Sequence, residues 1–443
     1  MAGKKKPLRE TVSTSRLKRG VKLGRLAAGV GARLALSRGG AALARLDKAT
    51  ARTEAGHLRS AEVMLGALGE MKGLALKLGQ MVSYADNDLP TPYRKLLAKL
   101  QADAPTMGIE TVVQVIEEEL GRPTEELFAS FDEVPLAAAS IGQVHRATLP
   151  DGREAVVKVQ FPGIADAMRA DIRNGTAVFA FGQLMFPHVK RSDLREEMMQ
   201  VMLEECDYRL EVANQREFGE LWSGHDVIVV PRVYDEFCSE RVITTEFVAG
   251  QRFEEFLASA SQSAKNRAGH AMLENMLVSF FGHGLFNGDP HPGNYIFRDD
   301  GRVAFLDYGC VKHIPDEMHG VFRDFLTATV RGDAEALGRA VRLLGYAPPG
   351  VTIEAEEWLR VERYVQRPWL LDEEFTFDRE YVRGIWPLLL KNPEMRKIGL
   401  PREFLFFNRL WFGLYAILTD LRASGNFHRI VRDLLTAGHH PDQ

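Results

Sequence analysis

The sequence is poor in cysteine. Its three cysteines among 443 residues, Cys206, Cys238 and Cys310, lie far apart and form no C-x-x-C pair. A disulfide framework and a zinc site are therefore not expected, and a reducing compartment is the default for such a chain.

Long apolar segments are absent as well. No uninterrupted apolar run reaches the roughly 18 residues that a membrane-spanning helix needs. The nearest candidate, residues 404–418, is broken by Asn408 and Arg409 and predicts a buried helix. The first residues also lack the apolar core of a secretory signal. We therefore expect a cytoplasmic protein, with peripheral contact to a membrane as an alternative.

Basic and acidic residues are unevenly distributed. Residues 1–53 contain 14 Lys and Arg against two acids, whereas the remaining chain has 42 basic and 58 acidic residues, for a total net charge of −4. A basic arm of this kind suits an anionic membrane surface or nucleic acid. An organelle transit peptide and a solvated tail that docks on the acidic body are the alternatives.

The periodicity of apolar residues predicts four segments. A basic arm (1–53) precedes a helical extension (54–130), which includes a helix over about 108–120 that stops at Gly121. Residues 131–250 read as a β-rich lobe, and 251–443 as a larger helical lobe. A cleft between two such lobes is a usual ligand site.

The β-rich lobe contains four predicted strands and a helical insert. Two of the strands flank the turn signal Pro150-Asp151-Gly152, and the other two lie further along the chain. The expected ranges are 141–147, 154–160, 227–230 and 242–247 for the strands, and 195–218 for the charged helical insert.

The strongest chemical signal is a loop followed by a hairpin in the helical lobe. The loop reads Asn287-Gly288-Asp289-Pro290-His291-Pro292-Gly293-Asn294, and a hairpin over 295–306 leads from it to Asp307-Tyr308-Gly309. Protein kinases separate a catalytic Asp from a metal-binding Asn by five residues and add a metal-binding Asp in D-F-G. Phosphoryl transfer needs magnesium held by a carboxylate and an amide oxygen, and a carboxylate near the attacking hydroxyl. We therefore predict Asp289 as catalytic, and Asn294 and Asp307 as magnesium ligands.

A second signal lies on a predicted strand. Ala155-Val156-Val157-Lys158 is typical of the kinase strand whose Lys meets nucleotide phosphates and a helix Glu. Several acids of the segment 204–211 could be that partner, and Glu211 is favoured. Lys158 and Glu211 are therefore predicted to act with Asp289.

The usual phosphate-binding loops are missing. No G-x-G-x-x-G and no P-loop occurs, and no A-P-E follows Asp307, so the peptide-docking part of a protein kinase is not visible. Where a kinase Gly-rich loop would lie, the chain has Ala137, Ala138, Ala139 and Ser140. Alanine resists positive φ, so this loop is stiffer than one built of glycine.

These motifs together resemble the UbiB/AarF family of atypical kinases. The resemblance rests on Lys77-Leu78-Gly79-Gln80, the Ala-Ala-Ala-Ser loop, Glu205-Cys206-Asp207, the Asp-Pro-His-Pro-Gly-Asn run and Asp-Tyr-Gly, and it covers roughly residues 54–330. It implies an α+β, protein-kinase-like two-lobed fold with a helical amino-terminal extension packed over the cleft.

The resemblance also implies roles for particular residues. ATP or ADP and magnesium would be the cofactors. Lys77 and Gln80 would restrain the active site, with Lys77 paired to Glu205 or Asp207, whose carboxylates have no other evident partner in the sequence. The expected nucleotide contacts are Ala137, Ala138, Ala139, Ser140, Lys158, Glu246 and Val248.

The function implied is an ATPase or atypical kinase that supports ubiquinone or other isoprenoid-lipid metabolism at a membrane. Expected partners are an isoprenoid or quinone-type lipid, an anionic membrane surface and lipid-biosynthesis proteins. A homodimer is left open, and nucleic acid is the less favoured partner. Two alternatives remain: a small-molecule phosphotransferase of the aminoglycoside-kinase type, and a catalytically inactive nucleotide-binding scaffold.

Overall fold

The computed structural model describes residues 107–139, 141–174, 203–347, 350–352, 354–397 and 405–437. The predicted basic arm, the extension up to residue 106 with Lys77 and Gln80, and Ser140 lie outside the described residues. Predictions about them stay predictions.

The chain divides into two compact units. The described parts of the first unit are residues 107–112, 135–139, 141–144, 159–174 and 203–206, and those of the second are 113–134, 145–158, 207–347, 350–352, 354–397 and 405–437. Five predicted site residues belong to the second unit: Lys158, Glu211, Asp289, Asn294 and Asp307.

The largest sheet has five strands in the order β1-β3-β4-β6, with β2 also paired to β3. The strands are β1 (Ser130–Phe131), β2 (Ala137–Ala138), β3 (Gly142–Thr148), β4 (Glu154–Gln160) and β6 (Val242–Glu246). The predicted turn between β3 and β4 is confirmed: Gly152 has φ 87° and its N–H donates to the Leu149 carbonyl. On β4, Val157 and Val159 are fully buried, and the alternation of a strand turns Lys158 to the opposite face.

In the sequence, helices α5 (Ile109–Leu120) and α6 (Thr124–Leu127) precede β1, and helix α7 (Ile164–Asn174) follows β4. The predicted helix over 108–120 is confirmed as α5. It ends at Gly121, whose φ of 66° belongs to the left-handed conformation that favours glycine after a helix. Arg241 fastens its last turn, with Nε 2.9 Å from Glu119 Oε1.

Helix α10 (Tyr208–Leu221) begins at Asp207, whose carboxylate accepts a hydrogen bond from the Arg209 N–H. An Asp at this position satisfies one of the unpaired N–H groups of the first turn. The helix buries its residues at helical spacing: Tyr208, Glu211, Val212, Gln215 and Phe218.

Three small sheets lie within the second unit. The predicted hairpin is confirmed as β8 (Tyr295–Phe297) paired antiparallel with β9 (Val303–Phe305). The strand predicted over 227–230 is confirmed as β5 (Ile228–Val229), which pairs in parallel with β9. The other two sheets were not predicted. They are formed by β7 (Leu285–Asn287) with β10 (Val311–His313), and by β11 (Phe375–Thr376) with β12 (Ser424–Gly425).

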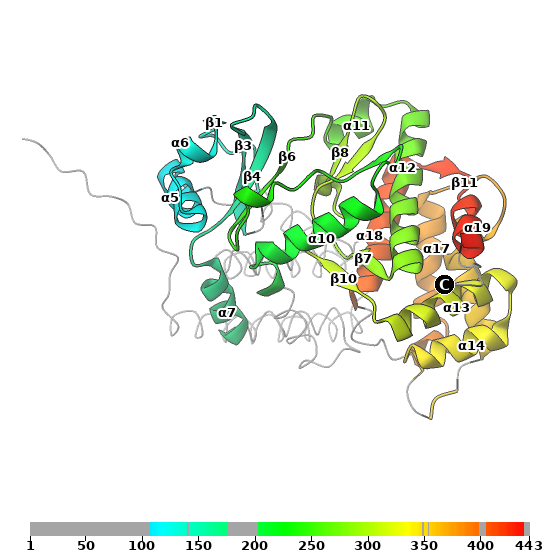
Figure 1. Cartoon of the computed structure of the whole chain (residues 1–443). Coiled ribbons are helices and arrows are strands. Elements are labelled where there is room, and N and C mark those ends of the chain that lie inside the picture. The colour runs from blue at the N-terminus through cyan, green and yellow to red at the C-terminus, as the bar shows by residue number, and fades with distance from the viewer. Residues whose placement is uncertain are drawn as a thin grey trace, which may run out of the picture. The chain divides into compact units, whose positions relative to one another are not determined.

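The rest of the second unit is mainly helical (Figure 1). Its helices are α11 (Phe253–Ser259), α12 (Gln262–Leu277), α13 (Asp316–Arg331), α14 (Ala334–Leu343), α15 (Ala355–Val365), α16 (Arg367–Leu370), α17 (Arg379–Leu390), α18 (Leu405–Leu421) and α19 (His428–Ala437). A π-helical turn, η2 (Val278–Gly282), extends α12, and short 3-10 turns are η1 (Asp235–Phe237), η3 (Pro292–Asn294) and η4 (Met395–Lys397).

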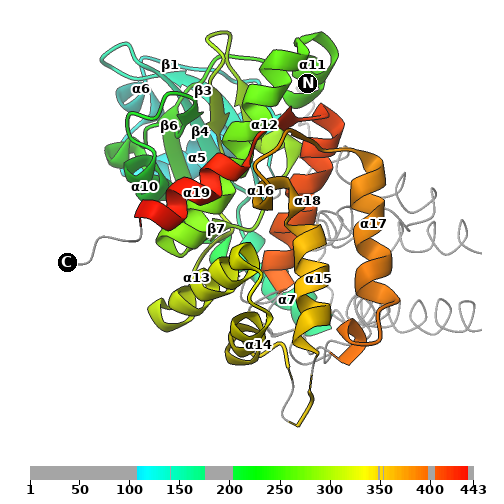
Figure 2. The same ribbon diagram turned by 90° about the vertical axis from the view of Figure 1, so that its right-hand side faces the viewer.

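Several helices of the second unit pack against one another. α12 lies beside α18, and Figure 2 shows α15 running alongside α17. The predicted buried helix over 404–418 is confirmed as α18, where Leu414, Tyr415 and Leu418 are almost fully buried. Within the described residues, no helix combines the length and the apolar character required to cross a bilayer.

Candidate phosphoryl-transfer site

Lys158 and Glu211 form a largely buried ion pair between β4 and α10. Lys158 Nζ lies 2.9 Å from Glu211 Oε1 and 2.8 Å from Oε2, so one ammonium group serves both carboxylate oxygens. The side chain of Glu211 is 7% exposed and that of Lys158 is 19% exposed. The partner that we favoured among the acids of 204–211 is therefore the residue that contacts Lys158.

The surroundings of Lys158 keep it charged. Burial by itself would lower its pKa, but the carboxylates of Glu211 and Asp307 outweigh burial and raise the pKa well above its ordinary value. The Tyr208 ring lies 4.9 Å from Nζ and adds a cation–π contact. Lys158 thus offers a fixed positive charge, which suits contact with phosphates.

The loop that carries Asp289 follows β7 and is held by internal hydrogen bonds. The Asp289 N–H donates to Asn287 Oδ1 at 3.1 Å, and Asn294 Nδ2 donates to the Asp289 carbonyl at 3.0 Å. The second bond uses the amide nitrogen of Asn294 and leaves its oxygen as the atom suited to a cation. Asp289 is 6% exposed.

The β8–β9 hairpin returns the chain to Asn294. The Leu306 N–H donates to the Asn294 carbonyl at 2.9 Å, so the ladder continues beyond the two strands. This register places Asp307 next to the loop. Its Oδ1 accepts from the Gly309 N–H at 3.0 Å, and its Oδ2 lies 3.8 Å from Lys158 Nζ.

The residues after Asp307 are anchored to α10. Asn214 Nδ2 donates to the Tyr308 carbonyl at 3.0 Å, and the Tyr308 ring packs on Phe218 with centroids 5.2 Å apart. Tyr308 is 1% exposed, and burial raises the pKa of its phenol well above the ordinary range. Tyr308 therefore serves packing, and the helix that carries Glu211 also fixes the segment that carries Asp307.

Asp289, Asn294 and Asp307 line one cavity. Its other walls are Met272, Asn275, Met276, Ser279, Asn287, Pro290, Tyr295, Phe305, Leu306, Leu410 and Leu414. Carboxylate and amide oxygens are the ligands that magnesium takes from proteins, with water and phosphate supplying the rest. Asn294 and Asp307 thus fit a magnesium ion. Within the described ranges, no three His, Cys, Asp or Glu side chains form a metal-binding group by themselves.

The structure describes most of the residues that we predicted to contact the nucleotide. Ala137 and Ala138 form β2, and the Ala139 N–H donates to the Gly142 carbonyl at 2.9 Å. Glu246 ends β6 and Val248 is buried. Their contacts with a nucleotide remain predictions.

Glu205 and Asp207 were expected to await Lys77. Asp207 Oδ1 accepts from the Arg209 N–H at 3.0 Å and so caps α10, while the predicted pairing with Lys77 stays a prediction. Glu205 is 9% exposed and directly precedes the buried Cys206. Whether Lys77 approaches either of them lies outside the described residues.

Sequence reasoning missed the polar side chains that hold this loop in place. Asn287 donates to the Asp307 carbonyl, Asn214 holds Tyr308, and His313 Nε2 on β10 lies 2.7 Å from Glu217 Oε2 on α10. The Asn287 turn alone had a signal, because Asn commonly bonds the N–H two residues on. The other two contacts join distant segments.

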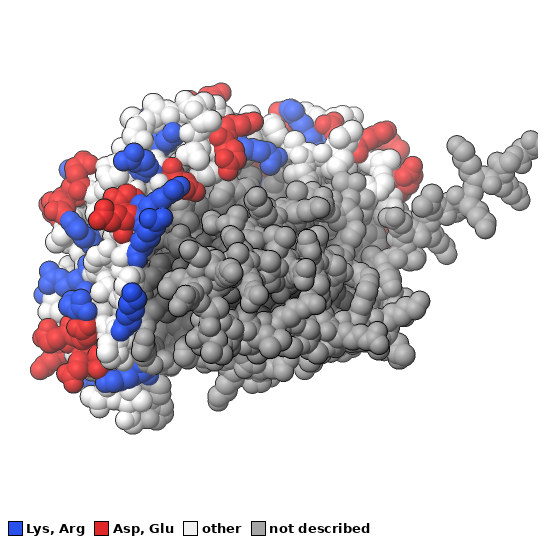
Figure 3. All heavy atoms as spheres, turned by 180° about the vertical axis from the view of Figure 1, so that it is seen from behind, with Lys and Arg blue, Asp and Glu red and all other residues white. Residues whose placement is uncertain are grey.

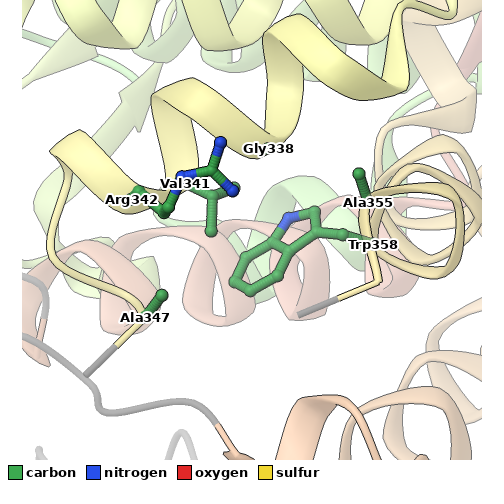
Figure 4. A pocket seen from close by; sticks show the side chains of 6 residues that line it. All are labelled: Gly338, Val341, Arg342, Ala347, Ala355 and Trp358. Carbon is green, nitrogen blue, oxygen red and sulfur yellow. The ribbon is translucent and has the colours of Figure 1, made fainter. Parts of the chain in front are cut away.

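Other features carry no comparable chemistry. Figure 4 shows a small hollow between α14 and α15, lined by Gly338, Val341, Arg342, Ala347, Ala355 and Trp358. Arg342 is the sole ionisable side chain among these six. Burial raises the pKa of Cys206 to about 11 and also raises that of Cys238, so neither thiol has nucleophilic character.

A Lys–Glu pair, an Asp and Asn on one loop, and an Asp after a hairpin form the arrangement that is typical of protein kinases. The chain belongs to the ABC1 atypical kinase-like family, whose domain matches residues 99–341. This finding confirms the predicted family.

Relatives with curated names share the family. The chain is 28% identical over 390 residues to "Atypical kinase COQ8B, mitochondrial" of Danio rerio, covering 85% of this chain and 61% of that protein. It is 27% identical over 439 residues to "Atypical kinase COQ8, mitochondrial" of Saccharomyces cerevisiae, covering 96% and 85%. The chain thus spans about three fifths of the length of the zebrafish protein.

A solved structure confirms the fold. Rv3197 from Mycobacterium tuberculosis, determined in complex with erythromycin, is 28% identical and superposes with a TM-score of 0.62, covering 88% of this chain and 98% of that one. The α+β, protein-kinase-like class that we predicted is thus correct.

Proposed function

We propose that this protein binds Mg-ATP and transfers its terminal phosphoryl group to water or to a small acceptor. The observation that carries the proposal is the convergence of Asp289, Asn294 and Asp307 on one cavity, with Asp307 also 3.8 Å from the Lys158–Glu211 pair. Complete phosphoryl-transfer equipment of this kind favours an enzyme over an inactive scaffold.

The roles follow from the chemistry of each group. Lys158, held by Glu211, binds nucleotide phosphates. Asn294 and Asp307 would hold magnesium, which neutralises charge that develops on the phosphoryl oxygens. Asp289 orients the attacking hydroxyl or water and takes its proton as the new P–O bond forms and the bond to the ADP oxygen breaks.

Hydrolysis of ATP by the purified protein tests this proposal. We expect magnesium-dependent turnover in the parent, with turnover lost in Asp289→Asn. Asp307→Asn should abolish the magnesium dependence of nucleotide-induced thermal stabilisation. Binding without turnover in the parent would favour the inactive scaffold. Transfer to an aminoglycoside would favour the small-molecule phosphotransferase. If the parent showed no nucleotide binding and no turnover, the assignment would be refuted.

We also propose that the acceptor or effector is an isoprenoid or quinone-type lipid and that the protein works at a membrane surface. The family resemblance and the +12 net charge of residues 1–53 support this. On the described surface visible in Figure 3, basic and acidic side chains are interspersed, so that view offers no uniform basic patch to take over the role of the arm.

Vesicle binding tests the membrane proposal. Polybasic segments gain about 1 kcal/mol per Lys or Arg near an anionic leaflet. The full chain should therefore sediment with anionic vesicles at low salt, and a chain lacking residues 1–53 should not. Equal sedimentation of both would contradict the proposal. Salt-sensitive binding of the full chain to duplex DNA, without vesicle binding, would instead favour nucleic acid.

The Lys77–Gln80 segment is proposed to restrain the site. Lys77→Ala should then change ATP turnover severalfold while the melting temperature holds. A variant that matches the parent in turnover, nucleotide affinity and melting temperature would show that Lys77 is merely solvated, as most lysines are.

A further inference from the structure

One planar amide connects the two acidic segments of the site. Asn287 ends β7, where it pairs with Val311 of β10. Its Oδ1 accepts from the Asp289 N–H at 3.1 Å, and its Nδ2 donates to the Asp307 carbonyl at 2.5 Å. The loop that carries Asp289 and the strand exit that carries Asp307 are therefore held by opposite sides of the same amide group.

This connection bears on catalysis because Asp289 and Asp307 act together. They are far apart in sequence, yet both line the cavity that also contains Asn294. The Asp307 carboxylate is fixed by the Gly309 N–H and faces Lys158, but those contacts do not set its distance from Asp289. Two links join the segments: the hairpin ladder, through the Leu306 N–H and the Asn294 carbonyl, and the Asn287 amide, which spans directly from the Asp289 N–H to the Asp307 carbonyl.

We infer that Asn287 is a positioning residue that sets the separation of Asp289 and Asp307. The inference rests on the proposed function and assigns to Asn287 a role that the phosphoryl-transfer motif does not require. Without the Nδ2 donor, the Asp307 carbonyl loses this hydrogen bond, and we expect the Asp307 carboxylate to shift relative to Lys158 and Asn294. A displacement of about 1 Å in such a site costs on the order of a hundredfold in rate.

Three substitutions separate the two hydrogen bonds. Asn287→Asp keeps the acceptor for the Asp289 N–H but puts an oxygen opposite the Asp307 carbonyl. Asn287→Ala removes both bonds. Asn287→His restores an acceptor and a donor, since His225 and His291 of this chain accept through Nδ1 from the N–H two residues on.

A matched control exists in Asn392. Its Oδ1 accepts from the Glu394 N–H, two residues on, at 2.9 Å, and its Nδ2 donates to Glu357 Oε1 at 2.7 Å. It is 7% exposed and lies outside the cavity. Asn392→Ala therefore removes the same kinds of bond from a buried amide without touching the site.

The experiment measures ATP turnover, the magnesium concentration for half-maximal turnover, the Kd of ADP with and without magnesium, and the melting temperature. We expect Asn287→Asp and Asn287→Ala to lower kcat by about tenfold to a hundredfold and to raise the magnesium requirement. Asn287→His should recover part of both. Asn392→Ala should lose stability while kcat and the magnesium requirement match those of the parent.

The inference is overturned if the Asn287 variants keep the parent's kcat and magnesium requirement, or if they change only as Asn392→Ala does. Failure of the proposed function would be distinguishable from failure of this inference, because the parent itself would then not turn over ATP. In that case, the magnesium dependence of ADP affinity still decides: a magnesium effect that is smaller in Asn287→Asp supports the inference, and an equal one contradicts it.

Discussion

Stability should fall as the pH rises through the titration range of Glu362, a carboxyl group on α15. Glu362 Oε1 accepts from Trp358 Nε1 at 3.2 Å and Oε2 accepts from Gln366 Nε2 at 2.9 Å. No cation pairs with it among the described residues. Burial raises its pKa to about 7, and the two hydrogen bonds only partly offset that rise.

The magnitude and sign follow from linkage. The pKa is about 7 in the folded state and 4.5 in the unfolded state, so the folded state binds the proton more tightly. The associated stability is present below pH 4.5 and is lost as the pH rises to 7, by roughly 3 kcal/mol at about 1.4 kcal/mol per unit.

The assay is urea unfolding of the parent and of Glu362→Gln at pH 5 and pH 8. The neutral variant should be more stable than the parent at pH 8, by up to about 3 kcal/mol, and clearly less advantaged at pH 5. Glu356→Gln, an exposed site on the same helix, controls for the loss of one negative charge. The same stability difference for Glu362→Gln at both pH values would refute the reasoning.

Three further outcomes are expected. Glu211→Gln leaves the buried Lys158 without its main partner and should lower the free energy of unfolding by about 3 kcal/mol and weaken ADP binding; unchanged calorimetric titration with ADP would contradict the pairing role. Gly142→Ala would put a Cβ 2.1 Å from the Val159 carbonyl oxygen, which forces β3 and β4 apart, so its melting temperature should drop more than that of any cap variant. Asp207→Ala removes the α10 cap and should cost about 1 kcal/mol, recovered in Asp207→Ser, and equal urea midpoints for Ala and Ser would show that the cap is idle.

Local features of the fold could be predicted from the sequence. Helix α5, the β3–β4 turn and the β8–β9 hairpin depend on periodicity and on Gly, Pro and Asp within a few residues, and those signals are complete in the local sequence. The spacing of Asp289, Asn294 and Asp307 belongs to the same kind of information. A hairpin with a short turn has one natural register, and that register places Asp307 beside Asn294.

The tertiary structure decided which distant segments meet. The local sequence of a two-residue strand such as β5 does not show which sheet the strand will join. In the fold, β5 pairs in parallel with β9 and not with the five-stranded sheet. β7 and β10 are equally short, and each becomes a strand because the other lies beside it. Several acids of the segment 204–211 could pair with Lys158 by sequence. In the fold, Glu211 on α10 is the one that contacts it.

The same holds for Asn287 and Glu362. By sequence, Asn287 is a turn residue and Glu362 is one of several acids on an amphipathic helix. The fold gives the first a second hydrogen bond to Asp307, and it removes the second from water, which raises the pKa of the Glu362 carboxyl. Secondary structure follows from neighbours in the chain, whereas hydrogen-bond partners and pKa values depend on groups that only chain folding brings within a few ångströms.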